Sequence, residues 1–92
     1  MDLTQYREKI DEIDSKLLTL FHQRMDISAQ IASYKQAHNL PIYVPEREHE
    51  KLAAVCAAAS PEMSAYVQEL FTMLFSLSKH YQEACTLTDN KK

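Results

Sequence analysis

The feature that most constrains the fold of this chain is an unbroken heptad pattern over residues 3–34. Nine apolar side chains and one arginine recur at alternating spacings of three and four residues: Leu3, Tyr6, Ile10, Ile13, Leu17, Leu20, Arg24, Ile27, Ile31 and Tyr34. This spacing places them in one stripe along an α-helix. Because no proline or glycine interrupts the run, we expect one helix over about 3–38.

Such a helix is too long for a compact domain of 92 residues. At ~1.5 Å per residue it measures about 50 Å. A compact chain of this length has a radius of gyration of about 12 Å, and hence a diameter of roughly 32 Å. The apolar stripe would therefore protrude into water unless something covers it. The simplest cover is a second copy of the chain; the alternative is an extended coiled coil without a binding site.

Two prolines end the first helix and begin a second one. Pro41 and Pro45 lie in the segment NLPIYVP, which cannot continue a helix. Pro45 suits the first position of a new helix, which we expect over about 45–58. Ser60 and Pro61 then form another start signal, with an N-cap serine followed by proline.

The third helix is expected over about 61–84, and the polar tail 86–92 is expected to fray. The chain contains no glycine, which argues against hairpins and an all-β fold. We therefore predict an all-α fold of three helices, with residues 1–92 forming a single domain.

Composition excludes several classes of protein. The formal net charge of −3 gives no basic footprint for nucleic acid. No apolar run is long enough to span a membrane, and the first residues lack the pattern of a signal peptide. The two cysteines and four histidines show no metal-ligand spacing. We expect no metal, and we expect reduced thiols in a cytoplasmic protein.

Arg24 is the residue that breaks the apolar stripe. A buried guanidinium without an anion is costly. One interpretation is an ion pair within the protein, or a side chain that extends to the edge of the stripe. The other is a ligand, because Lys35 lies on nearly the same helical face roughly 16 Å further along. Arg7 is about 25 Å from Arg24, so it could join them only from an antiparallel partner chain; otherwise it is a solvated charge.

Other polar residues have an ordinary and a functional interpretation. Arg47 and Glu48 lie in the first turn of the second helix, where charged residues are common. Ser78 and Gln82 are four residues apart and share one helical face, as a polar shoulder would. However, all three arginines of the chain fall in this set, and the guanidinium fork suits carboxylates. A cationic cluster in an apolar bundle favours a small dicarboxylate ligand.

The chain resembles the AroQ class of bacterial chorismate mutases. The resemblance rests on three segments, YREKIDEIDSKLLTLFHQR, ASYKQAHNLPIYVPERE and FSLSKHYQ, and extends from about residue 6 to residue 82. It implies an intertwined helical homodimer that rearranges chorismate to prephenate for aromatic amino-acid biosynthesis. It also implies two equivalent sites and no cofactor or covalent intermediate.

The resemblance also assigns roles to individual residues. It implies that Arg7 comes from the partner chain, that Arg24 and Ser78 contact substrate carboxylates, and that Arg47 and Glu48 lie near the substrate ring, with Glu48 at its hydroxyl. Lys35 and Gln82 match the two donors to the ether oxygen. Together with Arg24, they are the predicted catalytic residues.

Val44 departs from the family pattern, which commonly has aspartate at this position. Valine can neither cap the second helix nor assist at the substrate hydroxyl, so a mutase acting on an amino-substituted chorismate stays open. Two further alternatives are an isochorismate–pyruvate lyase on the same fold and a non-catalytic dimerisation module. The intact segment NLPIYVPERE favours the mutase over the lyase.

Overall fold

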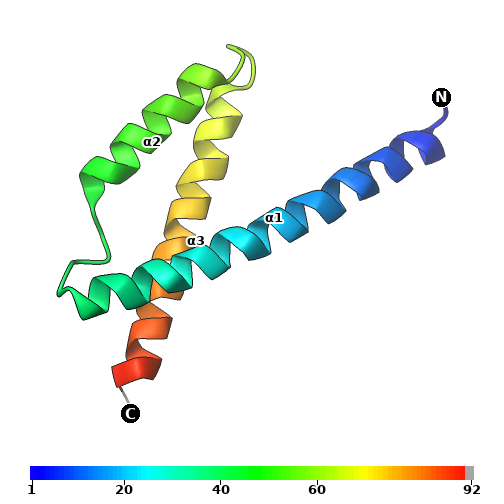
Figure 1. The fold of residues 1–92 in the computed structure, drawn as a ribbon. Coiled ribbons are helices and arrows are strands. Elements are labelled where there is room, and N and C mark those ends of the chain that lie inside the picture. Colours follow the sequence, from blue (N-terminus) through cyan, green and yellow to red (C-terminus); the bar gives the residue numbers. More distant parts are fainter. Residues whose placement is uncertain (91–92) are drawn as a thin grey trace.

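The structure is a computed structural model that describes residues 1–90 and the side chains of residues 1–86. It contains three helices, α1 (Leu3–Ala37), α2 (Pro45–Ala58) and α3 (Ser64–Asn90), and no strand within residues 1–90 (Figure 1). The predicted all-α fold of three helices is confirmed.

α1 begins and ends at specific capping contacts. At its start, the Asp2 carboxylate accepts from the Gln5 amide at 2.9 Å, and the Gln5 side chain accepts from the Asp2 amide at 2.9 Å, which forms a capping box. At its end, Asn39 adopts a left-handed conformation with φ of 56°. Asparagine tolerates this conformation better than most residues. The Leu40 amide then donates to the Lys35 carbonyl at 2.8 Å, which turns the chain away from the helix.

α2 starts at Pro45 after Val44, which occupies the N-cap in an extended conformation and makes no side-chain capping bond. The side chains that share one face at and after its second half are half-buried: Leu52, Val55, Cys56 and Ala59. α2 packs against α3, and α3 also packs against α1, whereas the described parts of α1 and α2 do not contact each other directly.

α3 differs from the expected span of 61–84 at both ends. It begins at Ser64 because the Ser60 carbonyl accepts from both the Met63 and the Ser64 amides, at 2.9 and 3.0 Å, and the resulting tight turn delays regular helix. It continues to Asn90 because no proline or glycine follows Ala84. Residues 86–90 are thus part of α3, and residues 91–92 lie outside the described residues. The expected fraying of the tail stays a prediction.

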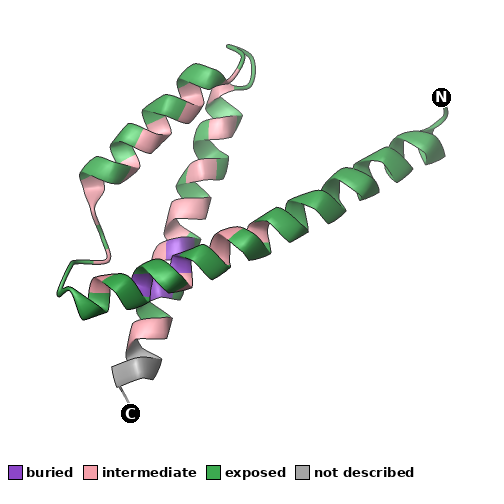
Figure 2. Cartoon of the chain, viewed as in Figure 1, coloured by how far each residue is buried: buried purple, intermediate pink, exposed green. Residues whose placement is uncertain are grey.

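The single chain has almost no hydrophobic core. Among the described residues, Ala32 is the one buried apolar side chain, at 2% exposure. The buried residues gather where α1 crosses α3 (Figure 2). The N-terminal half of α1 extends freely beyond the other helices (Figure 1). The radius of gyration is 16.6 Å, against about 12 Å for a compact chain of this length.

The solvent-exposed surface area also shows that the single chain is not compact. The chain exposes 7352 Å², roughly 1,900 Å² more than a compact monomer of its mass would. Much of the excess is apolar, because the stripe residues of α1 between Leu3 and Tyr34 are largely exposed. No helix within residues 1–90 is both long enough and apolar enough to cross a membrane.

Candidate functional site

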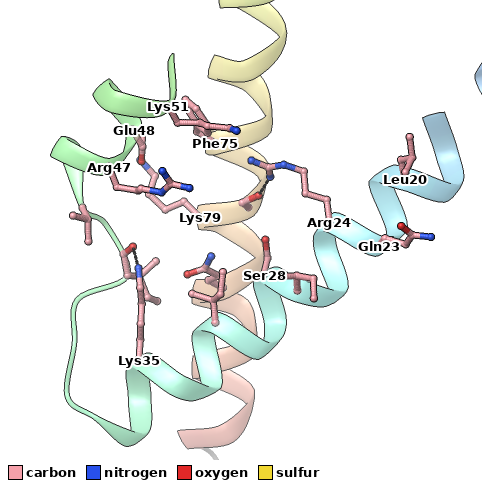
Figure 3. A pocket seen from close by; sticks show the side chains of 16 residues that line it. Leu20, Gln23, Arg24, Ser28, Lys35, Arg47, Glu48, Lys51, Phe75 and Lys79 are labelled. Carbon is pink, nitrogen blue, oxygen red and sulfur yellow. Dashed lines mark hydrogen bonds between the residues drawn. The ribbon is translucent and has the colours of Figure 1, made fainter. Parts of the chain in front are cut away.

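A cavity of about 650 Å³ lies between the C-terminal half of α1, the connection between α1 and α2, the first turns of α2 and the C-terminal half of α3 (Figure 3). The cationic side chains that line it are Arg24, Lys35, Arg47, Lys51 and Lys79, and the acidic one is Glu48. The neutral polar side chains are Gln23, Ser28, Ser78 and Gln82. The apolar side chains are Leu20, Ile27, Ile31, Ile42, Val44 and Phe75.

The charge of this lining is opposite to the charge of the protein. Five cationic side chains and one carboxylate line the cavity, although the chain as a whole carries a formal charge of −3. Positive side chains gathered around a concave, partly apolar surface concentrate anions there. The cavity therefore fits a small ligand that has an apolar body and more than one negative charge.

Arg24 reaches the cavity from the middle of α1. Its Nη1 donates to the Ser78 hydroxyl and, at 3.5 Å, to the Leu74 carbonyl of α3. Burial lowers the pKa of Arg24 because desolvation disfavours its charged form. Among the described residues no carboxylate pairs with it, so the ion pair considered from the sequence is absent there. A half-buried guanidinium of this kind is stabilised by an anionic ligand.

Lys35 approaches from the last turn of α1. Its Nζ donates to the Ile42 carbonyl at 2.8 Å, and Figure 3 shows the side chain extending from α1 toward this part of the connection. An ammonium group has three donors. The bond to Ile42 therefore fixes the direction of the side chain and leaves donors for a ligand.

Gln82 and Ser78 lie on the face of α3 that packs toward α1. They are 8% and 9% exposed. The Oε1 atom of Gln82 is buried and has no hydrogen-bond partner among the described residues. A buried polar atom without a partner is costly. Because the two ends of an amide differ only in donating or accepting, this side chain can present either function to a ligand.

The start of α2 contributes the remaining predicted residues. Arg47 and Glu48 lie in its first turn, and their amides donate to the Val44 carbonyl at 3.1 and 3.3 Å. Figure 3 shows both side chains between α2 and α3, with the Arg47 guanidinium directed into the cavity. Val44 lines the cavity but offers no polar group to a ligand.

The structure thus brings seven of the eight predicted residues to one cavity, and Arg7 is the exception. Arg7 lies in the second turn of α1, in the half of the helix that extends away from α3 (Figure 1). Within one chain the straight helix holds it about 25 Å from Arg24. It can join the site only from another chain.

The sequence analysis did not predict four polar residues of the cavity, Gln23, Ser28, Lys51 and Lys79. Lys51 lies one helical turn after Arg47. Two like charges at this spacing weaken a helix by about 0.2–0.5 kcal/mol, and this unfavourable pair could have indicated a functional role for Lys51. Ser28 follows Arg24 by four residues on the same face of α1 and is buried. Lys79 follows Ser78 directly and gave no signal, because a lysine beside a polar shoulder resembles an ordinary surface residue.

The described side chains include no group of three or more His, Cys, Asp or Glu placed to hold a metal ion. The side chains that line the cavity can act through hydrogen bonds, charge and shape. These are sufficient for a reaction that needs neither a nucleophile nor a proton acceptor.

Comparison with known proteins identifies similar sequences. The model of a family described as chorismate mutase type II matches residues 6–83. The chorismate mutase of Methanocaldococcus jannaschii is 32% identical over 97 aligned positions, which cover 98% of this chain and 96% of that protein.

Two longer relatives match part of the chain. The T-protein of Enterobacter agglomerans is 43% identical over 53 residues, which are 58% of this chain and 14% of that protein. The bifunctional chorismate mutase/prephenate dehydratase of Aquifex aeolicus is 43% identical over 49 residues, which are 53% of this chain and 14% of that protein. These matches therefore span about a seventh of each longer relative's length.

Proposed function

The chain belongs to the chorismate mutase type II family, and on this basis we propose that it rearranges chorismate to prephenate in the cation-lined cavity. The observation that carries the proposal is the positive charge around the cavity of about 650 Å³, which is lined by five cationic side chains and one carboxylate. Chorismate is a dianion with an apolar ring, which matches this lining. The cytoplasmic location inferred from the sequence stays a prediction.

The reaction is a pericyclic rearrangement. The carbon–oxygen bond of the enolpyruvyl ether breaks while a carbon–carbon bond forms between the side chain and the ring, and no proton is transferred. The protein can therefore contribute only by holding a reactive shape and by stabilising charge. Arg24, which is bonded to Ser78, and Lys35 would bind the carboxylates and hold the substrate in its compact conformation. Arg47 and Glu48, which enter from α2, would lie near the ring.

Lys35 and Gln82 would act on the ether oxygen. Negative charge grows on this oxygen as its bond stretches, so donors aimed at it stabilise the transition state more than the ground state. The bond to the Ile42 carbonyl holds Lys35 in place beforehand. The unpartnered end of the buried Gln82 amide supports a ligand contact at this point, with the amide turned so that it donates. Losing one such donor typically costs on the order of 3 kcal/mol.

We further propose that the active form is an intertwined homodimer, in which the partner's Arg7 completes each site. The exposed apolar stripe of α1 and the roughly 1,900 Å² of excess surface support this assembly. A stable interface buries about 800 Å² per partner, so the excess is ample. The alternative of a non-catalytic dimerisation module would not need unpaired cations around a cavity.

The test is a direct assay of chorismate loss by ultraviolet absorbance, with the product identified by mass. Prephenate is expected; salicylate with pyruvate would favour the lyase. Lys35→Met should lower kcat/KM by about 100-fold, whereas the matched control Lys16→Met, exposed on α1 away from the cavity, should keep the wild-type value. Wild-type protein that leaves chorismate unchanged would refute the proposal.

A further inference from the structure

Lys79 places a fifth positive charge on the cavity from α3. It lies between the two predicted ligand contacts of that helix, Ser78 and Gln82, and its side chain is half-buried. Its Nζ lies over the ring of Tyr43, 4.4 Å from the ring centroid. Figure 3 shows Lys79 extending from α3 toward the start of α2.

This orientation is not the one that a surface lysine would take by default. Glu83 is four residues along α3, where an acidic residue is an ordinary partner for a lysine. Among the described residues, however, no ion pair joins the two, and the ammonium instead lies on the Tyr43 ring. A cation held on a ring face keeps its hydrogen-bond donors free for another group. Lys79 therefore lines the cavity with a charge that no carboxylate among the described residues neutralises.

The connection between α1 and α2 orients two lysines through adjacent residues. The Ile42 carbonyl holds Lys35 of α1, and the Tyr43 ring holds Lys79 of α3. Both lysines line the same cavity. The two contacts have the same effect: in each, a group of the connection fixes the direction of a long, flexible side chain before a ligand arrives. Fixing it in advance reduces the entropy lost on binding.

We propose that Lys79 is a substrate-binding residue of this site, positioned by the Tyr43 ring, and that it contacts a carboxylate of the dianionic substrate. The inference rests on the proposed function and deepens it. The carboxylate carries its charge in both the ground state and the transition state, so half-exposed Lys79 holds the two about equally. Its contribution therefore appears in KM rather than in kcat.

The test compares four variants by steady-state kinetics at two ionic strengths. Lys79→Met keeps the length of the side chain and removes its charge; KM should rise about tenfold with kcat within about twofold, and the dependence of KM on salt should weaken. Lys79→Arg should restore most of the affinity. Tyr43→Leu removes the ring but not the charge and should raise KM about threefold, whereas Tyr43→Phe keeps the ring and should match wild type.

Two results would overturn the proposal. Equal effects of Lys79→Met and Tyr43→Leu, with unchanged salt dependence, would mean that Lys79 serves only to hold the connection. An unchanged KM for Lys79→Met would mean that it is a solvated charge. Failure of the proposed function is distinguishable, because wild-type protein would then leave chorismate intact. Calorimetric titration with chorismate would still compare wild type with Lys79→Met, and equal affinities or no binding would refute the contact.

Discussion

The partner-arginine hypothesis makes a quantitative prediction for mixed dimers of Arg7→Ala and Lys35→Ala chains. Each variant alone should lose activity by on the order of 100-fold, because each site lacks one charged contact. In a mixed dimer, the Arg7→Ala chain keeps its own Lys35 and receives Arg7 from its partner. That site is intact, and the other site carries both substitutions.

The expected recovery follows from this geometry. Arg7 cannot reach the cavity of its own chain, since the helix places it about 25 Å from Arg24. A purified mixed dimer should therefore have about half the wild-type activity, one intact site out of two. Random assembly from equal amounts of the two variants should give about a quarter of the wild-type activity. About half of the dimers are then mixed, and each mixed dimer has one intact site out of two. If Arg7 acted within its own chain, both sites would carry one lesion and no activity would return.

The assay uses two different affinity tags and sequential purification, so that only mixed dimers are measured. The matched control pairs Arg24→Ala with Lys35→Ala, two residues that line one cavity of one chain. Both sites of this mixed dimer carry a lesion, and no recovery is expected. The hypothesis fails if tagged mixed dimers of the first pair form but are no more active than their parents.

Three further predictions concern single residues. Val44→Asn should raise Tm by about 5 °C at fixed protein concentration, because it supplies a helix cap worth about 1 kcal/mol to a chain of this size. Val44→Asp should raise Tm equally and also change KM. An unchanged Tm for both variants would contradict the capping argument. Activity should be nearly flat across neutral pH because the Gln82 amide does not titrate, whereas Gln82→Glu should lose activity as pH rises through the pKa of the new carboxyl group; a steep wild-type loss above about pH 6, with the fold intact, would count against Gln82 as a donor. Ile13→Asp should dissociate the dimer in sedimentation experiments, because it places a charge in the apolar stripe, while Ser15→Asp on the opposite face should not; equal behaviour of both would remove the stripe as the interface.

The helices were predictable from the sequence because local signals determine them. The heptad run places α1 within one residue of the expected end, and Pro45 marks the start of α2. The start of α3 was misplaced because a serine followed by proline is a valid start signal that does not distinguish a tight turn from the first helical turn. Its end was misplaced because polarity alone does not stop a helix.

The cavity was predictable only in part, for a physical reason. Arg24 and Lys35 could be placed on one face of one helix by periodicity. Lys51 and Lys79 reach the same cavity from two other helices, and which way they point depends on how those helices cross. Crossing geometry is set by packing between elements distant in sequence. Periodicity within a single helix carries no information about it.

The long helix also explains why the apolar stripe tolerates an arginine at its centre. In a dimer, α1 would have two functions: it covers its partner, and it delivers Arg7 to a site about 25 Å from its own. Delivery over this distance requires a stiff spacer, since one inserted residue would rotate Arg7 by about 100°. The absence of glycine and proline from the run fits that requirement, because either would loosen or bend the helix. The substrate would then supply the anion that Arg24 lacks, and this contact would offset the cost of burying its guanidinium in the stripe. Folding, assembly and binding would all depend on the same helix.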